Sequence, residues 1–179
     1  MGGDRSFSAA AFVAASLDGY TARADGDVQW VAEHAERAWD DSYREFVADV
    51  DTFVMGRGTY EVVATLGPWP FAGKRVAVLS TRLAQAADRR VTVYRELDAL
   101  VSALGESGAR RVCVDGGRVV ETFLRAGLLD ELTVTTLPVL LGGGLPLSGA
   151  LDEDVHLTHR TTRVLGTGLV QSTYTVDGS

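Results

Sequence analysis

Two glycine turns, each placed between an apolar run and a helix-patterned segment, constrain the fold of this chain most strongly. In one, residues 112–115 (Val-Cys-Val-Asp) run into Gly116-Gly117 and a helical pattern. In the other, residues 51–55 run into Gly56 and a short helical pattern. Glycine lets bare backbone approach a ligand, and a helix N-terminus offers an anion unpaired N–H groups and a favourable dipole. The repetition predicts an α/β fold that binds a phosphorylated ligand.

The order of apolar patterns predicts strands that alternate with helices. Residues 7–15 are apolar or small without alternation, which is typical of a strand buried on both faces. Residues 16–29 form a long polar connection, and residues 31–50 carry apolar side chains near helical spacing, which predicts one amphipathic helix. The other predicted strands are 75–79, 92–94, 131–137, 155–164 and 169–176, and the other helices 97–104 and 118–125. We therefore expect one domain over residues 1–179, with a mixed, mainly parallel sheet and a C-terminal antiparallel hairpin.

Charge and composition exclude several classes of partner. The net charge is −7 and no basic cluster is present, so we expect no nucleic-acid partner. No apolar run approaches the roughly 20 residues of a membrane span, and the polar start of the chain does not resemble a signal peptide. We expect a cytoplasmic protein that does not bind membranes. We also expect no metal site, because His156 and His159 stand at i and i+3 of a predicted strand and so face opposite sides.

Polar residues that can hold phosphate follow two predicted strands. Arg57 offers a planar guanidinium fork and Thr59 a hydroxyl, although a surface arginine beside an N-capping threonine is the alternative. Residues 80–82 (Ser-Thr-Arg) end another strand, where α/β sheets bind ligands, although a plain polar loop is the alternative there. With the Gly116 turn, these positions suit a ligand with several phosphates. A nucleotide or dinucleotide is favoured over a sugar.

Common nucleotide and hydrolase motifs are missing. The chain has no G-x-x-x-x-G-K-[ST], and Lys74 is its single lysine, which disfavours ATP chemistry. It has no G-x-G-x-x-G and no G-x-S-x-G, which disfavours an ordinary Rossmann site and an α/β-hydrolase.

Four groups of segments, in the same order along nearly the whole chain, carry a family resemblance. They are 12–22 (FVAASLDGYTA) with 28–30 (VQW), 54–61 (VMGRGTYE), 116–117 (GG) with 126–132 (AGLLDEL), and 138–142 (PVLLG). Together they resemble the reductase domain of bacterial riboflavin biosynthesis and its dihydrofolate-reductase-like relatives. The resemblance implies a dihydrofolate-reductase-like three-layer α/β sandwich with NADPH as the hydride donor.

The resemblance also implies which residues meet the coenzyme. The nicotinamide side would be lined by Ala14, Ala15 and Trp30. The pyrophosphate and the adenosine-side phosphate would be held by Gly56, Arg57 and Thr59. The 2′-phosphate, which makes NADPH rather than NADH the expected coenzyme, would be met by Ser80, Thr81 and Arg82. Backbone contacts to the pyrophosphate would come from Gly116, Gly117, Arg118, Val119 and Val120.

The substrate side departs from the family. A riboflavin-pathway reductase is expected to carry a basic residue near Phe12 and a serine at Val28, and both departures argue against a phosphorylated ribityl or ribosyl substrate. Asp115 falls where that group tends to have a glutamate and can hydrogen-bond a heterocycle. Dihydrofolate reductases place a carboxylate where this chain has Ala35.

We therefore predict an NADPH-dependent reductase of a small pterin- or pyrimidine-like heterocycle or a similar electron-poor double bond. Asp18, Asp115 or a water would deliver the proton, although Asp18-Gly19 is also ordinary turn chemistry. Two alternatives stay open: a nucleotide-binding protein of the same fold without turnover, and a true dihydrofolate reductase. Relatives of this group are commonly dimeric, so we expect a homodimer, with the apolar residues 137–147 as an interface or a flap.

Overall fold

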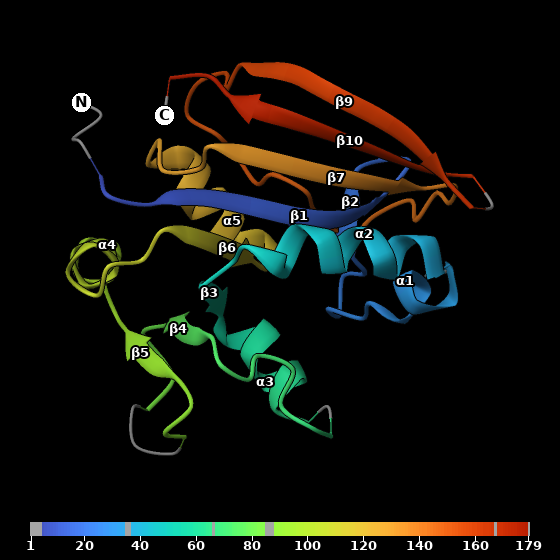
Figure 1. Ribbon diagram of the computed structural model, residues 1–179. Coiled ribbons are helices and arrows are strands. Elements are labelled where there is room, and N and C mark those ends of the chain that lie inside the picture. Colours follow the sequence, from blue (N-terminus) through green and yellow to red (C-terminus); the bar gives the residue numbers. More distant parts are fainter. Residues whose placement is uncertain (1–4, 35–36, 66, 85–87, 167, 179) are drawn as a thin grey trace.

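The computed structural model describes residues 5–34, 37–65, 67–84, 88–166 and 168–178, and its centre is one eight-stranded sheet (Figure 1). The strands of this sheet are β1 (Ser8–Ser16), β3 (Thr52–Gly56), β4 (Arg75–Leu79), β5 (Thr92–Tyr94), β6 (Arg111–Asp115), β7 (Glu131–Leu137), β9 (Leu157–Leu165) and β10 (Leu169–Val176). They lie in the order β5-β4-β3-β6-β1-β7-β10-β9. The first six run parallel, and β10 and β9 add an antiparallel hairpin. This confirms the predicted mixed, mainly parallel sheet and its C-terminal hairpin.

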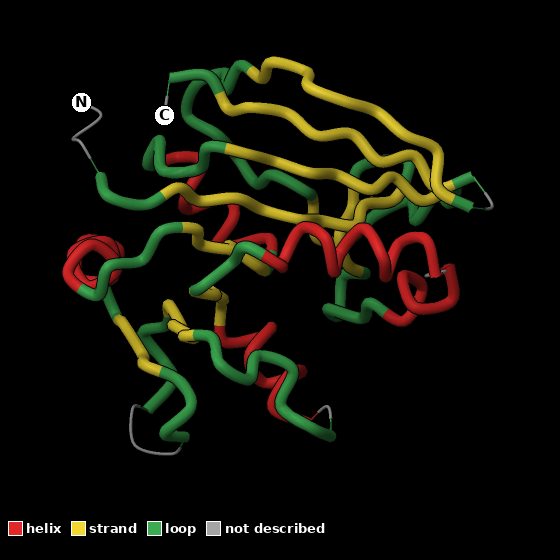
Figure 2. The backbone as a smooth tube through the Cα atoms, viewed as in Figure 1, coloured by secondary structure: helices red, strands yellow, loops and turns green. Residues whose placement is uncertain are grey.

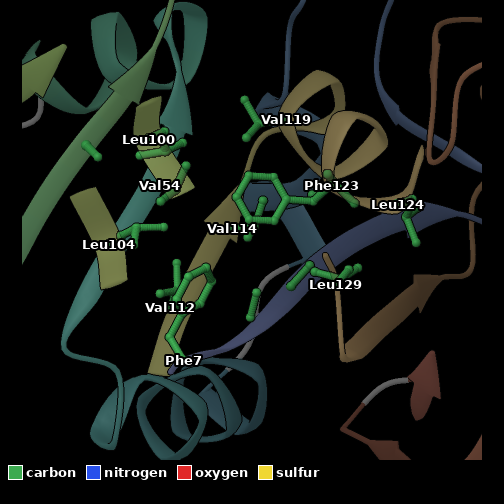
Figure 3. Packing of buried hydrophobic residues seen from close by; sticks show 14 of the residues in the cluster. Phe7, Val54, Leu100, Leu104, Val112, Val114, Val119, Phe123, Leu124 and Leu129 are labelled. Carbon is green, nitrogen blue, oxygen red and sulfur yellow. The ribbon is translucent and has the colours of Figure 1, made fainter. Parts of the chain in front are cut away.

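Helices lie on both faces of the sheet and complete three layers (Figure 2). The helices are α1 (Gln29–His34), α2 (Arg37–Ala48), α3 (Arg57–Thr65), α4 (Leu97–Glu106) and α5 (Gly117–Arg125). On one face, Phe46 of α2 packs in a cluster with Phe53 of β3. On the other, Leu100 of α4 and Phe123 of α5 pack over Val112 of β6 (Figure 3). No helix in the described part of the chain is long and apolar enough to cross a bilayer.

Strand β1 occupies the middle of the sheet, between β6 and β7. Ala9, Ala10 and Ala11 are each fully buried, as expected for a strand that is covered on both faces. Their small side chains leave room for the layers on either side.

Two sequence expectations are corrected. The helix predicted over residues 31–50 is divided into α1 and α2, with residues 35–36 outside the described part of the chain. The polar connection of residues 16–29 contains a short strand, β2 (Tyr20–Ala22), which pairs with β8 (Leu145–Pro146) in a second, two-stranded sheet. The partner of β2 is distant in sequence, so local pattern carries no signal for this pairing.

The N-terminal edge of the parallel strands is tied together by Asp51. Its carboxylate accepts hydrogen bonds from the Thr52 hydroxyl (2.7 Å) and the Arg110 N–H (2.9 Å), and it pairs with Arg75 (3.1 Å). Burial acts to raise the pKa of Asp51, but these donors hold it below its usual value. This edge is therefore occupied by structural contacts, and the opposite edge carries the polar turns.

Candidate active site

The C-terminal ends of four neighbouring parallel strands meet at one edge of the sheet. In the order β4, β3, β6, β1, these strands end at Leu79, Gly56, Asp115 and Ser16. Gly56 pairs with Leu79, and Met55 pairs with Asp115, so the strand ends are level with one another. The structure therefore brings the three turns singled out in the sequence to the edge where α/β sheets bind ligands.

The two glycine turns touch each other. Gly116 is the N-cap of α5 and has a φ of +91°, a conformation that L side chains rarely adopt. A Cβ at this position would lie 2.5 Å from Oγ1 of Thr59, on the first turn of α3. Glycine at 116 is thus required both by backbone conformation and by close approach. The Thr59 hydroxyl consequently lies beside the N-terminus of α5.

The backbone donors at this N-terminus are fewer than the sequence suggested. The N–H groups of Val119 and Val120 both donate to the Gly116 carbonyl at 3.0 Å, and both side chains are buried in the core. The predicted set of backbone donors is therefore narrowed to Gly117 and Arg118, whose N–H groups stand in the first turn, where a helix supplies no partner.

Three arginines follow the ends of β3, β4 and β6 at this edge, in a chain whose net charge is −7. Arg57 is half-exposed and pairs with Glu61 at 2.6 Å, while Arg82 and Arg118 are exposed. The Ser80 oxygen accepts hydrogen bonds from the N–H groups of Arg82 and Leu83, both at 3.1 Å. The Ser80 hydroxyl thereby keeps its proton to donate to a further acceptor. Thr81 lies in the same turn, exposed between these two residues.

Asp115 is partly buried at the end of β6, with apolar neighbours on the two adjacent strands. It pairs with Met55 on one side, and because Ala11 pairs with Val114, Phe12 lies beside it on the other. The ring of Tyr43, from α2, contacts the Phe12 ring with centroids 5.4 Å apart. Burial raises the pKa of Asp115, and the hydrogen bond from Gly116 offsets this only in part. The carboxyl therefore keeps its proton to a higher pH than an ordinary aspartate.

Asp18 has different surroundings. Its carboxylate accepts hydrogen bonds from the Ser16 hydroxyl (2.6 Å) and from the N–H groups of Leu141 (3.1 Å) and Gly142 (2.8 Å). The Ser16 hydrogen bond is the main reason that the pKa of Asp18 is lowered. This carboxylate is charged, and it ties the end of β1 to the loop after β7. Of the two candidate proton donors, Asp115 is the one whose pKa is raised.

The nicotinamide-side candidates divide between the two faces of the sheet. Ala14 is two residues from Phe12 and so shares its face, while Ala15 points to the opposite face and is buried there. Trp30 is 2% exposed and packs in a cluster with Ala14 and Leu137. Its indole N–H is buried and meets no acceptor in the described part of the chain. Ala35, where a dihydrofolate reductase would carry its carboxylate, lies outside the described residues.

Two features of the site were missed in the sequence. Tyr43 stands three residues before Phe46 on the amphipathic pattern, and that spacing is a signal that could have placed both over Phe12. The second feature is the two-stranded sheet of β2 and β8, which no local sequence pattern indicates. A Cβ on Gly117 would lie 3.5 Å from Oγ1 of Thr21 and 3.7 Å from the Pro146 carbonyl. Strands β2 and β8 therefore stand directly at the N-terminus of α5.

Of two cavities, one begins at this edge, and the other runs from Phe12 toward Arg111 and Glu131 at the N-terminal edge of the parallel strands. A groove of about 600 Å³ begins at Arg118 and follows the outer side of α5 past Thr122 to Arg125, with Leu97 opposite. A crevice of about 180 Å³ opens beside Phe12, between α2 and the hairpin strands. Neither is lined by Asp115.

Comparisons with known proteins agree with this fold. The uncharacterized protein YwjB of Bacillus subtilis (strain 168) is 33% identical over 158 residues, 87% of this chain and 90% of its own. The riboflavin biosynthesis protein RibD of Corynebacterium ammoniagenes is 30% identical over 148 residues, which are 74% of this chain and 43% of that protein. A Shewanella sp. PV-4 crystal structure, provisionally assigned to riboflavin biosynthesis, superposes with a TM-score of 0.82 at 30% identity, over 96% of this chain and 99% of its own.

The family match covers nearly the whole described fold. Residues 9–171, from β1 into β10, match the RibD C-terminal domain, which is a reductase domain. The solved neighbours share the dihydrofolate-reductase-like fold that the sequence resemblance implied. This chain therefore belongs to the RibD C-terminal domain family.

Proposed function

We propose that this protein is an NADPH-dependent reductase that transfers a hydride to a small pterin- or pyrimidine-like heterocycle or a similar electron-poor double bond. The observation that carries the proposal is the convergence of three phosphate-capable turns beside one carboxyl of raised pKa. Membership of a reductase family and the riboflavin biosynthesis name of a relative support it.

The residues at this edge fit a phosphorylated dinucleotide. The Gly116 turn has no room for a Cβ, so bare backbone and the Thr59 hydroxyl face the same position. Arg57 and Thr59 would hold the phosphates on the adenosine side, and Ser80, Thr81 and Arg82 the 2′-phosphate. The N–H groups of Gly117 and Arg118 would meet the pyrophosphate. The buried Trp30 N–H adds an unsatisfied donor near Ala14.

NADPH supplies the hydride when it is bound, and this chain's residues supply position and a proton. The protonated Asp115 oxygen would donate its proton to the acceptor atom next to the carbon that receives the hydride, and would regain a proton from solvent. Phe12, Met55 and Ala14 would exclude water from this position.

Replacing Arg57 and Arg82 together with alanine is expected to weaken NADPH binding by at least about 100-fold, because two charge-assisted contacts of about 1.5–3 kcal/mol each are lost. Fluorescence titration of NADPH measures this. Arg44→Ala on α2, which removes an exposed arginine paired with Asp41, is the matched control and should leave affinity unchanged. An unaltered NADPH affinity in the double variant would refute the proposal that NADPH binds at this edge.

The turnover test is the loss of nicotinamide absorbance with pterin, pyrimidine, dihydrofolate and quinone acceptors. Oxidation with a pterin or pyrimidine supports the proposal. NADPH binding without oxidation by any acceptor would instead support the nucleotide-binding alternative. Stabilisation by an antifolate together with dihydrofolate turnover would support the true dihydrofolate reductase.

We also propose a homodimer formed through the hairpin strands. Eight of the nine residues of β9 are exposed, and Val164, 71% exposed, stands opposite Val170 on β10. β9 is an open edge, and an antiparallel pair of identical strands obeys the two-fold symmetry of a dimer. Val164→Asp is expected to halve the mass measured by light scattering. Val62→Asp, at a 51% exposed valine on α3, should leave it unchanged; a wild type already at the monomer mass would refute the dimer.

A further inference from the structure

We infer that Arg95 selects the coenzyme, because its guanidinium binds the 2′-phosphate of NADPH together with the turn of residues 80–82. This inference rests on the proposed function, since it concerns the adenosine end of the same site. No sequence pattern singles out Arg95, which follows a strand of only three residues. The structure shows where its side chain lies.

Arg95 stands at the same edge of the sheet as the phosphate-capable turns. Strand β5 runs parallel to β4, and Leu79 pairs with Tyr94, so the chain leaves both strands at the same level. The Ser80 N–H donates to the Tyr94 carbonyl at 2.8 Å, which joins the two strand ends. The turn of residues 80–82 is therefore fixed next to Arg95.

The Arg95 guanidinium is held at this turn. Its Nη1 donates to the Thr81 carbonyl oxygen at 2.7 Å, and the side chain is otherwise exposed. This bond uses one N–H group of the guanidinium fork, and the other N–H groups meet no acceptor in the described part of the chain. A side chain that is already held in place loses less entropy when a ligand binds. Arg95 is therefore preorganised to donate to a ligand at the turn.

The charge of Arg95 is also available to a ligand. Arg57, which is assigned to the neighbouring turn, pairs with Glu61 at 2.6 Å. Arg90, just before β5, donates to both carboxylate oxygens of Asp88. Arg95 pairs with no carboxylate among the residues that the structure describes, so no ion pair has to break before it holds an anion.

The donors at this turn suit a phosphate monoester. Arg82 and Arg95 supply two guanidinium groups, and Ser80 and Thr81 supply hydroxyls in the same turn. A phosphate monoester carries about two negative charges at neutral pH and strong acceptor oxygens. NADPH has such a group where NADH has a hydroxyl. Arg95 therefore favours NADPH over NADH.

The test compares NADPH with NADH, which differ only in the 2′-phosphate. Both are titrated by fluorescence into wild-type protein and into Arg95→Ala. We expect Arg95→Ala to bind NADPH at least about tenfold more weakly, because one charge-assisted contact is lost, and to bind NADH as wild type does. Arg110→Ala is the matched control, at an arginine side chain that is 88% exposed at the opposite edge of the sheet, and it should change neither affinity.

Arg95→Gln separates a direct contact with the phosphate from support of the turn. Glutamine keeps an N–H donor for the Thr81 carbonyl but carries no charge. This variant should bind NADPH as weakly as Arg95→Ala, and in both variants NADPH affinity should depend less on salt than in wild type. A wild-type NADPH affinity in Arg95→Gln would mean that Arg95 only supports the turn, and would overturn the inference.

The outcomes distinguish this inference from the proposed function. If wild-type protein prefers NADPH and Arg95→Ala keeps that preference, the inference fails and the proposed function stands. Equal wild-type affinities for NADPH and NADH would overturn the inference and the assignment of residues 80–82 to the 2′-phosphate. Wild-type protein that binds neither coenzyme would refute the proposed function together with the inference.

Discussion

An Asp115→Asn variant is expected to turn over at least about 100-fold more slowly than wild type with NADPH and its acceptor, because a positioned general acid contributes 10²–10⁴-fold to rate. The amide keeps the shape of the carboxyl but holds no acidic proton. The affinity for NADPH should not change, since Asp115 is proposed to meet the acceptor and not the phosphates. Steady-state rates and NADPH titration measure the two quantities separately.

The pH dependence distinguishes proton donation from a structural role. Burial raises the pKa of Asp115, so the wild-type rate should fall as pH rises through that raised value, while the variant should show no such fall. A carboxyl with a raised pKa stabilises the fold only below that pKa and loses this contribution as pH increases. Asp115→Asn should therefore be at least as heat-stable as wild type at neutral pH. Unaltered turnover would exclude Asp115 as the donor.

Asp18→Asn is the matched control at the same site. Its carboxylate ties Ser16 to the N–H groups of Leu141 and Gly142, and its pKa is lowered. Substitution should leave the shape of the pH profile unchanged. If Asp18→Asn altered the pH profile of the rate and Asp115→Asn did not, Asp18 would be the proton donor and Asp115 would not.

The second large effect is expected at Gly116. Gly116→Ala places a side chain at a φ of +91°, at a cost of about 1–2 kcal/mol, and its Cβ would lie 2.5 Å from Oγ1 of Thr59, at a further cost of about 1–3 kcal/mol. The unfolding midpoint should fall by roughly 4–20 °C. The affinity for NADPH should fall by at least about tenfold, because the backbone proposed to face the pyrophosphate must move. Calorimetry and NADPH titration measure these losses.

Gly58→Ala makes the same chemical change in the neighbouring glycine turn, at the start of α3. No heavy atom lies within 4 Å of a Cβ built on Gly58, which stands within α3, so this variant should be as stable as wild type or slightly more stable. Adding Thr59→Ala to Gly116→Ala should restore part of the lost stability, because it removes the contact and leaves the backbone strain. Equal midpoints for Gly116→Ala and wild type would contradict the close approach of the two turns.

The sequence predicted most of the fold because its strands carry local signals. The bounds of β4, β5 and β7 coincide with the predicted ranges 75–79, 92–94 and 131–137. These are short apolar or β-branched runs between polar or turn residues. What the sequence could not supply was the pairing of β2 with β8, since each is too short to show a pattern and its partner is distant in the chain.

The site divides in the same way. The convergence of the turns was predictable, because the C-terminal ends of parallel strands share one edge. Three details depend on neighbours that the local sequence does not specify. The Val119 and Val120 N–H groups are used by Gly116, Ala15 faces away from Asp115, and Asp18 holds the loop after β7.

The central place of β1 has a consequence for biosynthesis. Ser8 pairs with Arg111, and Ala10 pairs with Glu131, so the first strand to leave the ribosome has no partner until most of the chain has been translated. Its apolar residues stay unpaired in the nascent chain, although helices α1–α4 can already form. Closure of the sheet is therefore a late, long-range event, which is slow and exposed to aggregation. A polypeptide that stopped before β7 would leave this strand without one of its two neighbours and accessible to chaperones and proteases.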